Sequence, residues 1–529
     1  MNASPSTPAG AALPPRTSVF LVGSVASLAG ILFGFDSGIA ASSGGAVNQH
    51  FGITDDPFLK GLWVACVPLG ALFGALLGSK VSTGLGRKKG LLLNAVLFFL
   101  AISLAAFAPT LSLFVISRFL MGLAIGNSAV ITPMYLAEMV PPAARGRVGF
   151  LYQLSIVVGI LVSFVIGVVV TGLVADDNEN WRIMIGFALI PAVIFFFGML
   201  RMPESARWLV EKGREEDARR SLLRTVDEEE AEKVLGEIVE ANARSEKAPL
   251  SAIFGRMIFP VIILGFLLQF FQQSTGINAD MYFGPEIFKE GGFGSAAALW
   301  AQVGMGVVNL AATIFSIFLV DRIGRRRLMI IGATGIVAML AVQSYLFHLY
   351  DSDRAAAGMG PSVTSQEHKH TLPNVGSTVG HPSHKPSTPL PAETAQAEAT
   401  FESPVTGWIY ASILVYIVFF AISAGPLCWL IISEIFPLRF RGIGMSIAVA
   451  ANWLVNYLVS QLFPVMKTDL GMPVTTLIYA AFTLVGLILA IRYLPETKGV
   501  PLERIEANIW AGRPLRRIGD PEEGTERAT

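Results

Sequence analysis

The chain has 529 residues, of which 53% are hydrophobic and 15% are charged, and its mean hydropathy is +0.58. Soluble domains carry about 25% charged residues, so this composition excludes an ordinary soluble protein. The formal net charge is zero, which leaves no bulk electrostatic attraction to nucleic acid. The two cysteines, Cys66 and Cys428, stand far apart in apolar segments, so we expect no disulfide framework, no metal site and no cofactor.

Apolar runs recur along nearly the whole chain, and each is long enough to cross a bilayer as a helix. The first run has no small-residue cleavage site, so we expect it to be retained as a span. The sequence therefore predicts an all-α integral membrane protein with twelve transmembrane helices. We expect the spans at residues 19–41, 57–79, 90–108, 111–137, 148–174, 181–201, 257–287, 297–319, 327–350, 407–433, 442–466 and 473–494.

Basic residues are concentrated in one set of connecting loops, and the short loops of the other set hold almost none. The positive-inside rule predicts that the basic loops face the cytoplasm. Twelve spans put both termini on that same side, so we expect both to be cytoplasmic in a multi-pass protein of the cell membrane. The basic residues are Arg87, Lys88, Lys89, Arg145, Arg147, Arg322, Arg325, Arg326, Arg327, Arg439 and Arg441.

Four segments lie outside the expected spans. Residues 1–18 and 495–529 are expected to be cytoplasmic tails, and residues 202–256 are rich in Glu, Arg and Ala, as in short amphipathic helices on the cytoplasmic face. Residues 351–404 are rich in Ser, Thr, Pro and Gly, which predicts a disordered insertion outside the membrane. That insertion holds four of the six histidines but no structured scaffold, so we expect no metal there. They are His368, His370, His381 and His384.

The chain repeats itself. Glu138 is followed seven residues later by an Arg-Gly pair, and so is Glu434. The segments 86–88 and 324–326 also correspond, as do 203–205 and 495–497. The displacement between copies grows by about the length of the 351–404 insertion once that segment is passed. We therefore expect two six-helix halves, at 19–201 and 257–494, with the substrate site between them near the midplane.

Two opposite charges are expected inside the membrane. Asp36 lies in the first span and Arg118 in the fourth. At about 1.5 Å per residue, both fall in the outer half of the membrane core, where charged residues pair or line a pathway. A carboxylate there can take a proton and lose its pairing with the guanidinium, which is a physical basis for proton coupling. The alternative is a static ion pair between helices.

Further charges gather at the cytoplasmic ends of the spans in both halves. We expect salt bridges among them to hold the inner side shut and to break when the halves rock. The alternative is that these residues anchor the helices at the interface without gating. The candidate gating residues are Arg87, Glu138, Arg145, Arg147, Glu204, Asp321, Arg322, Arg325, Arg326, Glu434, Arg441 and Glu496. Another acid, Asp280, is expected to be a solvated residue at the outer mouth.

Amide and indole side chains occur in the apolar helices. Amides can bind sugar hydroxyls, and tryptophan rings can cover the C–H face of a sugar. The alternative for each amide is a hydrogen bond between helices. A binding site is favoured around residues 272–278, where we expect the helix to break at Gly276 and Pro285. The polar and aromatic candidates are Gln153, Gln272, Gln273, Asn278, Asn309, Trp429, Asn452, Trp453 and Asn456.

Several motifs resemble those of the sugar porter family of the major facilitator superfamily, over residues 19–505 without 351–404. The closest likeness is to bacterial proton-coupled symporters of the xylose type, and glucose facilitators are also related. The motifs are Leu120–Gly126, Tyr135–Glu138 with Arg145, Pro203–Leu209, Gln272–Ala279, Gly425–Trp429 and Pro495–Gly499.

The resemblance implies import of a monosaccharide and a proton by a protein that is not an enzyme and that works as a monomer. It implies that Asp36 couples protons with Arg118 as its partner, and because facilitators typically lack this aspartate, it favours symport. It implies that the sugar site is lined by Gln153, Gln272, Gln273, Asn278, Asn309, Trp429 and Asn452, with Phe33, Trp453 and Asn456 beside it.

The sequence departs from the family pattern in places. Thr83 stands where an acidic or amide residue is usual, which predicts a weaker inner gate in the first half. Phe283 replaces a tyrosine, and Ile160 resembles the glucose facilitators, which favours a hexose over a pentose. A uniporter, a carrier of a polyol or inositol, and a sugar receptor that does not transport remain as alternatives. The short tail after Glu496 argues against the receptor.

Overall fold

The computed structural model describes residues 18–139, 145–174, 177–243, 254–358, 403–437 and 439–520. Within these residues the chain is helical and contains no strand. The first group of helices comprises α1 (Val19–His50), α2 (Pro57–Leu85), α3 (Arg87–Ala106), α4 (Leu111–Met139), α5 (Arg145–Leu173), α6 (Asp177–Gly186) and α7 (Leu189–Arg201). The second group comprises α11 (Phe259–Ser274), α12 (Ile277–Glu290), α13 (Ser295–Ile323), α14 (Arg325–Ala356), α16 (Thr406–Ile422), α17 (Ala424–Ile435) and α18 (Arg441–Tyr493).

The helices account for twelve membrane crossings. Eleven helical segments of the described residues are long and apolar enough to span a bilayer. The last of them, α18, has 53 residues and contains Gly471 in a non-helical conformation, with φ 77° and ψ 165°, so it makes two crossings joined by a kink. Because only glycine adopts this conformation readily, Gly471 does the work of a loop between the last two expected spans. The predicted all-α membrane fold is confirmed.

Three of the crossings are built from two helices each. The turn after α6 divides the sixth, Gly276 divides the seventh into α11 and α12, and Ser423 divides the tenth into α16 and α17. The expected break at Gly276 is present, but the one expected at Pro285 is wrong, because α12 continues through that residue. A proline leaves the carbonyl four residues earlier without its helical partner. Here that carbonyl, of Met281, accepts a hydrogen bond of 3.3 Å from the Gln302 side chain, which lets the helix continue.

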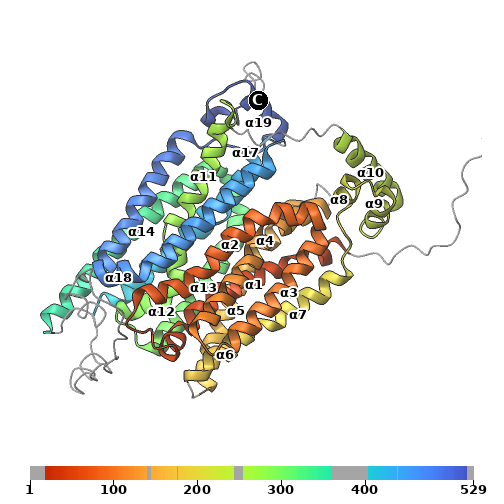
Figure 1. The fold of residues 1–529 in the computed structure, drawn as a ribbon. Helices are drawn as coiled ribbons and strands as arrows, with labels where there is room; N and C mark the ends of the chain where they lie inside the picture. Colours follow the sequence, from red (N-terminus) through yellow and green to blue (C-terminus); the bar gives the residue numbers. More distant parts are fainter. Residues whose placement is uncertain are drawn as a thin grey trace, which may run out of the picture.

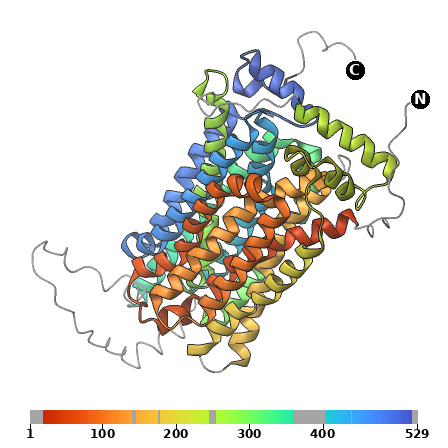
Figure 2. The ribbon, with the colours of Figure 1, turned by 45° about the vertical axis from the view of Figure 1, so that its right-hand side comes forward.

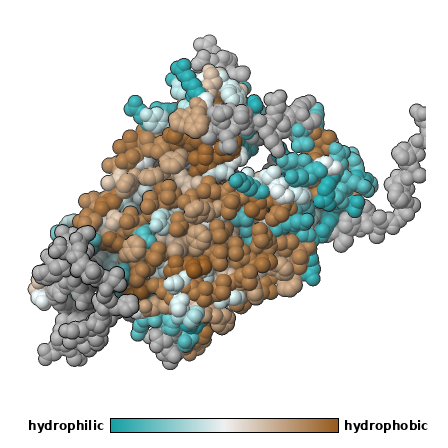
Figure 3. Space-filling model, viewed as in Figure 1, coloured by the Kyte–Doolittle hydropathy of each residue, from teal (hydrophilic) through white to brown (hydrophobic). Residues whose placement is uncertain are grey.

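The two groups of helices lie side by side, with α1, α2 and α5 facing α12, α18 and α13 (Figure 1). Short helices cover one end, which we call the linker end: α8 (Ala206–Glu211), α9 (Glu215–Leu222), α10 (Glu228–Ala243) and α19 (Leu502–Trp510) (Figure 2). Hydrophobic side chains form a broad band around the helices, and hydrophilic ones gather at the ends (Figure 3). The opposite end is called the far end below.

Glycines bring helices of the first group into backbone contact. A Cβ atom added to Gly70 or Gly74 of α2 would collide with the backbone of α4, and one added to Gly126 of α4 would collide with the backbone of α2. Gly34 of α1 and Gly159 of α5 approach each other's helices in the same way. Small residues at such crossings allow the close packing that holds membrane helices together. The first group is therefore packed with little side-chain material between its helices.

The two groups meet closely at the far end. The Gln461 side chain of α18 donates a 3.1 Å hydrogen bond to the Phe58 carbonyl of α2, and Gly61 packs against the same glutamine. Deeper in, the ring centroids of Phe33 and Trp453 lie 5.3 Å apart across the same boundary. At the linker end the space-filling view shows a hollow between the groups (Figure 3). The structure is thus closed at the far end and open at the linker end.

Candidate functional site

A buried ion pair joins α1 to α4. The Arg118 guanidinium donates a hydrogen bond to the Asp36 carboxylate, and the two side chains are 2% and 5% exposed. The guanidinium also lies over the Trp63 ring of α2, 5.6 Å from its centroid. Oppositely charged groups this deep in a membrane protein compensate each other's loss of hydration. The structure therefore brings together the two charges expected inside the membrane.

A chain of amide side chains connects four helices of the second group. Asn278 of α12 donates to Gln273 of α11 at 2.5 Å, and Gln273 donates to Asn452 of α18 at 3.1 Å. Asn452 donates in turn to the Gln272 oxygen at 2.5 Å, and Gln272 donates to the Gly425 carbonyl of α17 at 2.9 Å. Each amide offers both a donor and an acceptor. The arrangement can exchange these mutual hydrogen bonds for bonds to the hydroxyl groups of a ligand.

Gln269 belongs to the same chain but was missed by the sequence reasoning. It is fully buried, and its oxygen accepts a 2.7 Å hydrogen bond from Asn452. Its side-chain nitrogen has no hydrogen-bond partner in the part of the chain that the structure describes. The signal was available, because Gln269 lies three and four residues before Gln272 and Gln273, on the same face of an apolar helix.

The helix breaks supply further polar groups at this level. Gly276 has φ 84°, in the left-handed region, and Ser423 has φ −129° and ψ −95°. The Thr275 carbonyl beside the first break accepts a 3.1 Å hydrogen bond from the Tyr416 hydroxyl, and the Ala424 carbonyl beside the second accepts one from Gln272. Irregular backbone inside a membrane protein persists where protein groups or a water-filled cavity satisfy it. The two breaks therefore belong to the same polar centre as the amides.

Aromatic side chains lie next to the amide chain. The Tyr282 hydroxyl accepts a 3.3 Å hydrogen bond from Asn456, and it also reaches Ser37, the residue after Asp36. Trp453 packs on Phe33, and its indole N–H is buried without a partner. Trp429 of α17 is partly buried. Tyr282 thus lies between α1, the helix that carries Asp36, and Asn456, which stands one turn after Asn452 on α18.

The two remaining amide candidates stand on α5 and α13. Neither Gln153 nor Asn309 makes a hydrogen bond within the described part of the chain, and Gln153 is only half-buried. Their helices pack together where Gly306 meets Phe164. Of the residues that depart from the family pattern, Ile160 is buried, and Phe283 stacks on Phe463 at 5.2 Å. The donors and acceptors of Gln153 and Asn309 are therefore not taken up by hydrogen bonds to other described residues.

A charged network joins helices of the first group to one another at the linker end. Arg87 pairs with Glu138 at 2.8 Å, and Glu138 accepts a 2.5 Å hydrogen bond from the Ser205 hydroxyl. Glu204 accepts the backbone N–H groups of Arg87 and Lys88, at 2.9 and 3.0 Å. These are the first N–H groups of α3, so Glu204 caps that helix from a distant part of the chain.

The second group repeats this network. Arg325 pairs with Glu434 at 3.2 Å, and Glu434 accepts a 2.5 Å hydrogen bond from Thr497. Glu496 caps α14 by accepting the backbone N–H groups of Arg325 and Arg326, at 2.9 and 3.2 Å. An extra ion pair of 3.4 Å joins Arg325 to Asp321, whose counterpart in the first group is Thr83. The sequence repeat is thus a repeat of one structural device.

The other gating candidates are placed less centrally. Arg322 is exposed, and Arg441 donates a 3.4 Å hydrogen bond to the Phe436 carbonyl. The side chains of Arg145 and Arg147 lie outside the described residues, as do the four histidines of the insertion. The pairs described above each join residues of one group and its adjoining segment. They therefore tie helices together within a group rather than across the boundary.

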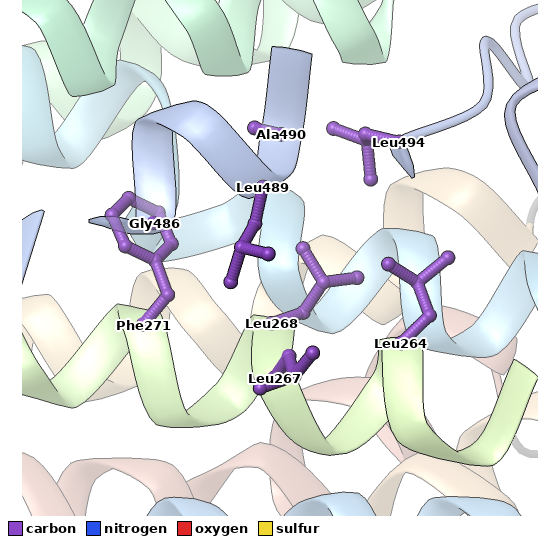
Figure 4. A pocket seen from close by; sticks show the side chains of 8 residues that line it. All are labelled: Leu264, Leu267, Leu268, Phe271, Gly486, Leu489, Ala490 and Leu494. Carbon is purple, nitrogen blue, oxygen red and sulfur yellow. The ribbon is translucent and has the colours of Figure 1, made fainter. Parts of the chain in front are cut away.

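A shallow apolar groove lies apart from this centre, between α11 and the second part of α18 (Figure 4). It is lined by Leu264, Leu267, Leu268, Phe271, Gly486, Leu489, Ala490 and Leu494. These side chains offer no hydrogen-bonding group, so the groove cannot recognise hydroxyls. Among the described residues there is also no cluster of three His, Cys, Asp or Glu that could hold a metal ion.

Comparison with known proteins places this centre in a family. Residues 22–364 and 394–509 match the model of the family described as sugar (and other) transporters. The galactose-proton symporter of Escherichia coli (strain K12) is 34% identical over 510 residues, which cover 95% of this chain and 97% of that protein. The major myo-inositol transporter IolT of Bacillus subtilis is 33% identical over 490 residues, which cover 92% and 93%.

The solved structures that resemble this chain are also sugar transporters. The xylose transporter XylE from E. coli, in a partially occluded inward open conformation, superposes with a TM-score of 0.71 at 28% identity, covering 91% of this chain and 99% of that chain. XylE bound to 6-bromo-6-deoxy-D-glucose gives a TM-score of 0.68 at 28% identity, covering 92% and 98%. The chain therefore belongs to the sugar porter family of the major facilitator superfamily, as a multi-pass membrane protein with the fold of those transporters.

Proposed function

We propose that this protein imports a monosaccharide together with a proton, by exposing one site alternately to the two sides of the membrane. The observation that carries the proposal is the buried Asp36–Arg118 pair on α1 and α4. Tyr282 lies beside Ser37 of α1 and accepts a hydrogen bond from Asn456, which stands one turn after Asn452 of the amide chain on α18. Galactose–proton and xylose–proton symporters among the similar proteins support it. In this proposal the linker end, with its basic loops, faces the cytoplasm, and the protein works as a monomer in the lipid bilayer.

The proton acts on the ion pair. When Asp36 takes a proton from the outside, it loses its charge, and its bond to Arg118 weakens. Arg118 keeps its position over Trp63, so the change falls on α1 and on the contact between Ser37 and Tyr282. Because that contact joins the two halves at the closed end, weakening it favours opening towards the outside. Release of the proton to the inside restores the pair and the closed outer end.

The sugar acts on the amides. Its hydroxyls would replace the mutual hydrogen bonds of Gln272, Gln273, Asn278 and Asn452, while Gln153 and Asn309 bind it from the other side. Trp429 and the Phe33–Trp453 pair would cover its apolar face. A bound sugar then bridges the two halves, and α12 closes over it at the outside. Binding energy that is gained only when both halves contact the sugar drives the change of conformation.

We propose a hexose as the substrate. Ile160, which resembles the glucose facilitators, supports a hexose, and a glucose transporter of Staphylococcus epidermidis is 32% identical over 495 residues, 93% of this chain and 98% of that protein. The myo-inositol transporter among the relatives keeps inositol as the second candidate. One hydrogen bond contributes a net of only about 0.5–1.5 kcal/mol, so closely related sugars compete for such a site.

The test is uptake into proteoliposomes of labelled glucose, galactose, xylose and myo-inositol, with and without an inward proton gradient. We expect accumulation above equilibrium only with the gradient. Asp36→Asn should abolish accumulation while sugar exchange survives. The matched control is Asp56→Asn: Asp56 caps α2 through the Leu59 N–H at 2.9 Å, and asparagine caps a helix equally well. Equal uptake with and without the gradient would make the protein a facilitator, and binding without uptake would make it a receptor.

A further inference from the structure

A second acid lies inside the membrane, on the other half of the molecule. Asp280 stands in the first turn of α12, ten residues before the end of that helix. At about 1.5 Å per residue it lies about 15 Å inside the far end. Asp280 therefore lies deeper than the mouth position expected from the sequence, although the residue is only half-buried. Because the crossing breaks at Gly276, in its interior, the turn that follows the break is also interior.

Asp280 faces away from the sugar site. It follows Asn278 by two residues, which places the two side chains on nearly opposite faces of the helix. Two tyrosines lie within electrostatic reach of its carboxyl group: Tyr416 of α16 and Tyr479 of α18. The Tyr416 hydroxyl donates a 3.1 Å hydrogen bond to the Thr275 carbonyl. The Tyr479 hydroxyl is buried and has no hydrogen-bond partner among the described residues, and its ring packs against Gly276.

Asp280 has no counter-charge. Asp36 is paired with Arg118, whereas no ion pair or hydrogen bond is formed by Asp280 within the described residues, and no basic side chain among them acts on it. An uncompensated charged residue in the middle of a membrane span is energetically unfavourable. A carboxyl group that carries a proton avoids this cost. As a neutral group it can share a hydrogen bond with the vacant Tyr479 hydroxyl.

The surroundings of Asp280 change with the position of α12. The residue lies just beyond the Gly276 hinge, on the part of the broken helix that contacts α1. Its neighbour Tyr479 lies on the last crossing, which does not share that hinge. Asp280 as a residue is half-buried in the present conformation. Movement of α12 thus alters the enclosure of the acid, which is the condition for binding a proton on one side and releasing it on the other.

We propose that Asp280 is a second proton-binding site and that two protons accompany each sugar. The carboxylate takes a proton from water on the outside when α12 swings outward, and it returns that proton to water on the inside after the outer end closes. Asp36 carries the other proton in the first half. This inference rests on the proposed symport. The number of protons per sugar distinguishes the second proton site from symport through Asp36 alone.

The experiment measures that number from a zero-flux balance. Proteoliposomes receive a tenfold outward-directed sugar gradient at zero membrane voltage, and the opposing pH gradient that stops net sugar flux is found. A tenfold gradient is balanced by about one pH unit for one proton and by about half a unit for two protons. We expect about half a unit for the wild type and about one unit for Asp280→Asn and Asp280→Val. Both variants remove an acid without a counter-charge, so both are expected to fold, and sugar exchange without any gradient verifies it.

Each outcome decides between the proposals. A wild-type balance at about one pH unit, unchanged in Asp280→Asn and Asp280→Val, overturns the second proton site and leaves symport through Asp36 intact. A half-unit balance that persists in both variants also overturns it. A flux that no pH gradient stops would show that symport itself is absent. Asp280→Glu serves as the conservative variant and should restore the half-unit balance, because it keeps a carboxyl group at the same place.

Discussion

Lys467 lies 3.1 Å from the Glu286 carboxylate, although the lysine side chain is only 6% exposed. The same ammonium group lies 3.3 Å from Glu290, one turn further along α12. One cation on α18 thus holds the two acids near the far end of the helix that carries Asn278 and Tyr282. Because α12 is the part of the broken helix expected to move over the sugar, this cluster sets its resting position.

We predict that Lys467→Met destabilises the protein by about 1–3 kcal/mol, because it removes the cation that the two half-buried acids share. A thermal-shift measurement in detergent should show a clearly lower Tm. Adding Glu286→Gln to Lys467→Met should recover part of the loss, since one uncompensated charge is then removed. Lys80→Met, at an exposed position of α2, is the matched control and should leave Tm unchanged. A Tm for Lys467→Met equal to that control would show that the cluster contributes nothing.

Asn452 is the central member of the amide chain, with bonds to Gln269, Gln272 and Gln273. We predict that Asn452→Ala raises the KM for sugar by about 10–100-fold, because hydrogen-bonding groups worth about 1–3 kcal/mol are lost or left unpaired. Initial rates of uptake over a range of sugar concentrations measure it. Asn94→Ala is the control, since Asn94 bonds to Ser128 at 3.0 Å within the first half. It should lower stability but not raise KM, and an equal rise in both variants would remove Asn452 from the site.

Gly86 and Gly324 precede the capped helices, and each has φ 95°. A Cβ atom at either glycine would also collide with the capping carboxylate, of Glu204 or Glu496. We therefore predict that Gly86→Ala and Gly324→Ala each lower stability by about 1–3 kcal/mol, from backbone strain and a displaced cap. Gly84→Ala is the control, because a Cβ atom there meets nothing within 4 Å and the residue is helical. Thermal unfolding of the three variants should separate Gly84→Ala from the other two.

Trp208 docks the linker helices onto the first group, since its indole N–H donates a 2.9 Å hydrogen bond to the Thr83 carbonyl. We predict that Trp208→Ala undocks α8–α10 from the first group. Limited proteolysis with trypsin should then cleave residues 202–256 faster than in the wild type. Arg219→Ala should have little effect, because its pairs with Glu228 and Glu232 are exposed and such pairs contribute about 0–1 kcal/mol. Bonding to Glu232 raises the pKa of Arg219 further above its usual value, so the arginine stays charged and no pH dependence follows. Equal protection of Trp208→Ala and the wild type would contradict the docking role.

The membrane spans were predictable because apolar length and basic loops are local properties of the chain. The break at Gly276 was predictable because glycine tolerates the left-handed backbone. The continuation of α12 through Pro285 was not, because it depends on Gln302, a residue of another helix. The two distant glutamate caps were visible only as a sequence repeat, since nothing local shows that Glu204 reaches the start of α3.

The sequence predicted which residues belong to the candidate site better than it predicted how they bond to one another. The sequence indicated which amides stand inside the membrane, but not that Asn278, Gln273 and Asn452 bond to one another in order. Gln269 was overlooked although its spacing on α11 marks it. Asp280 lies deeper than expected because α12 continues for ten residues beyond it, past Pro285. Such errors arise where the side chain's environment comes from three or more helices.

The backbone contacts between α2 and α4, and between α1 and α5, bear on how force travels through the protein. Helices joined through glycine at Gly74 or Gly159 have few alternative packings. A displacement at one end of a half is therefore transmitted to its other end almost unchanged. The whole conformational equilibrium is then decided along the seam between the halves. A bias there of about 1.4 kcal/mol changes the ratio of the two conformations tenfold. One hydrogen bond to a hydroxyl of the sugar is therefore enough to shift the ratio of the two conformations.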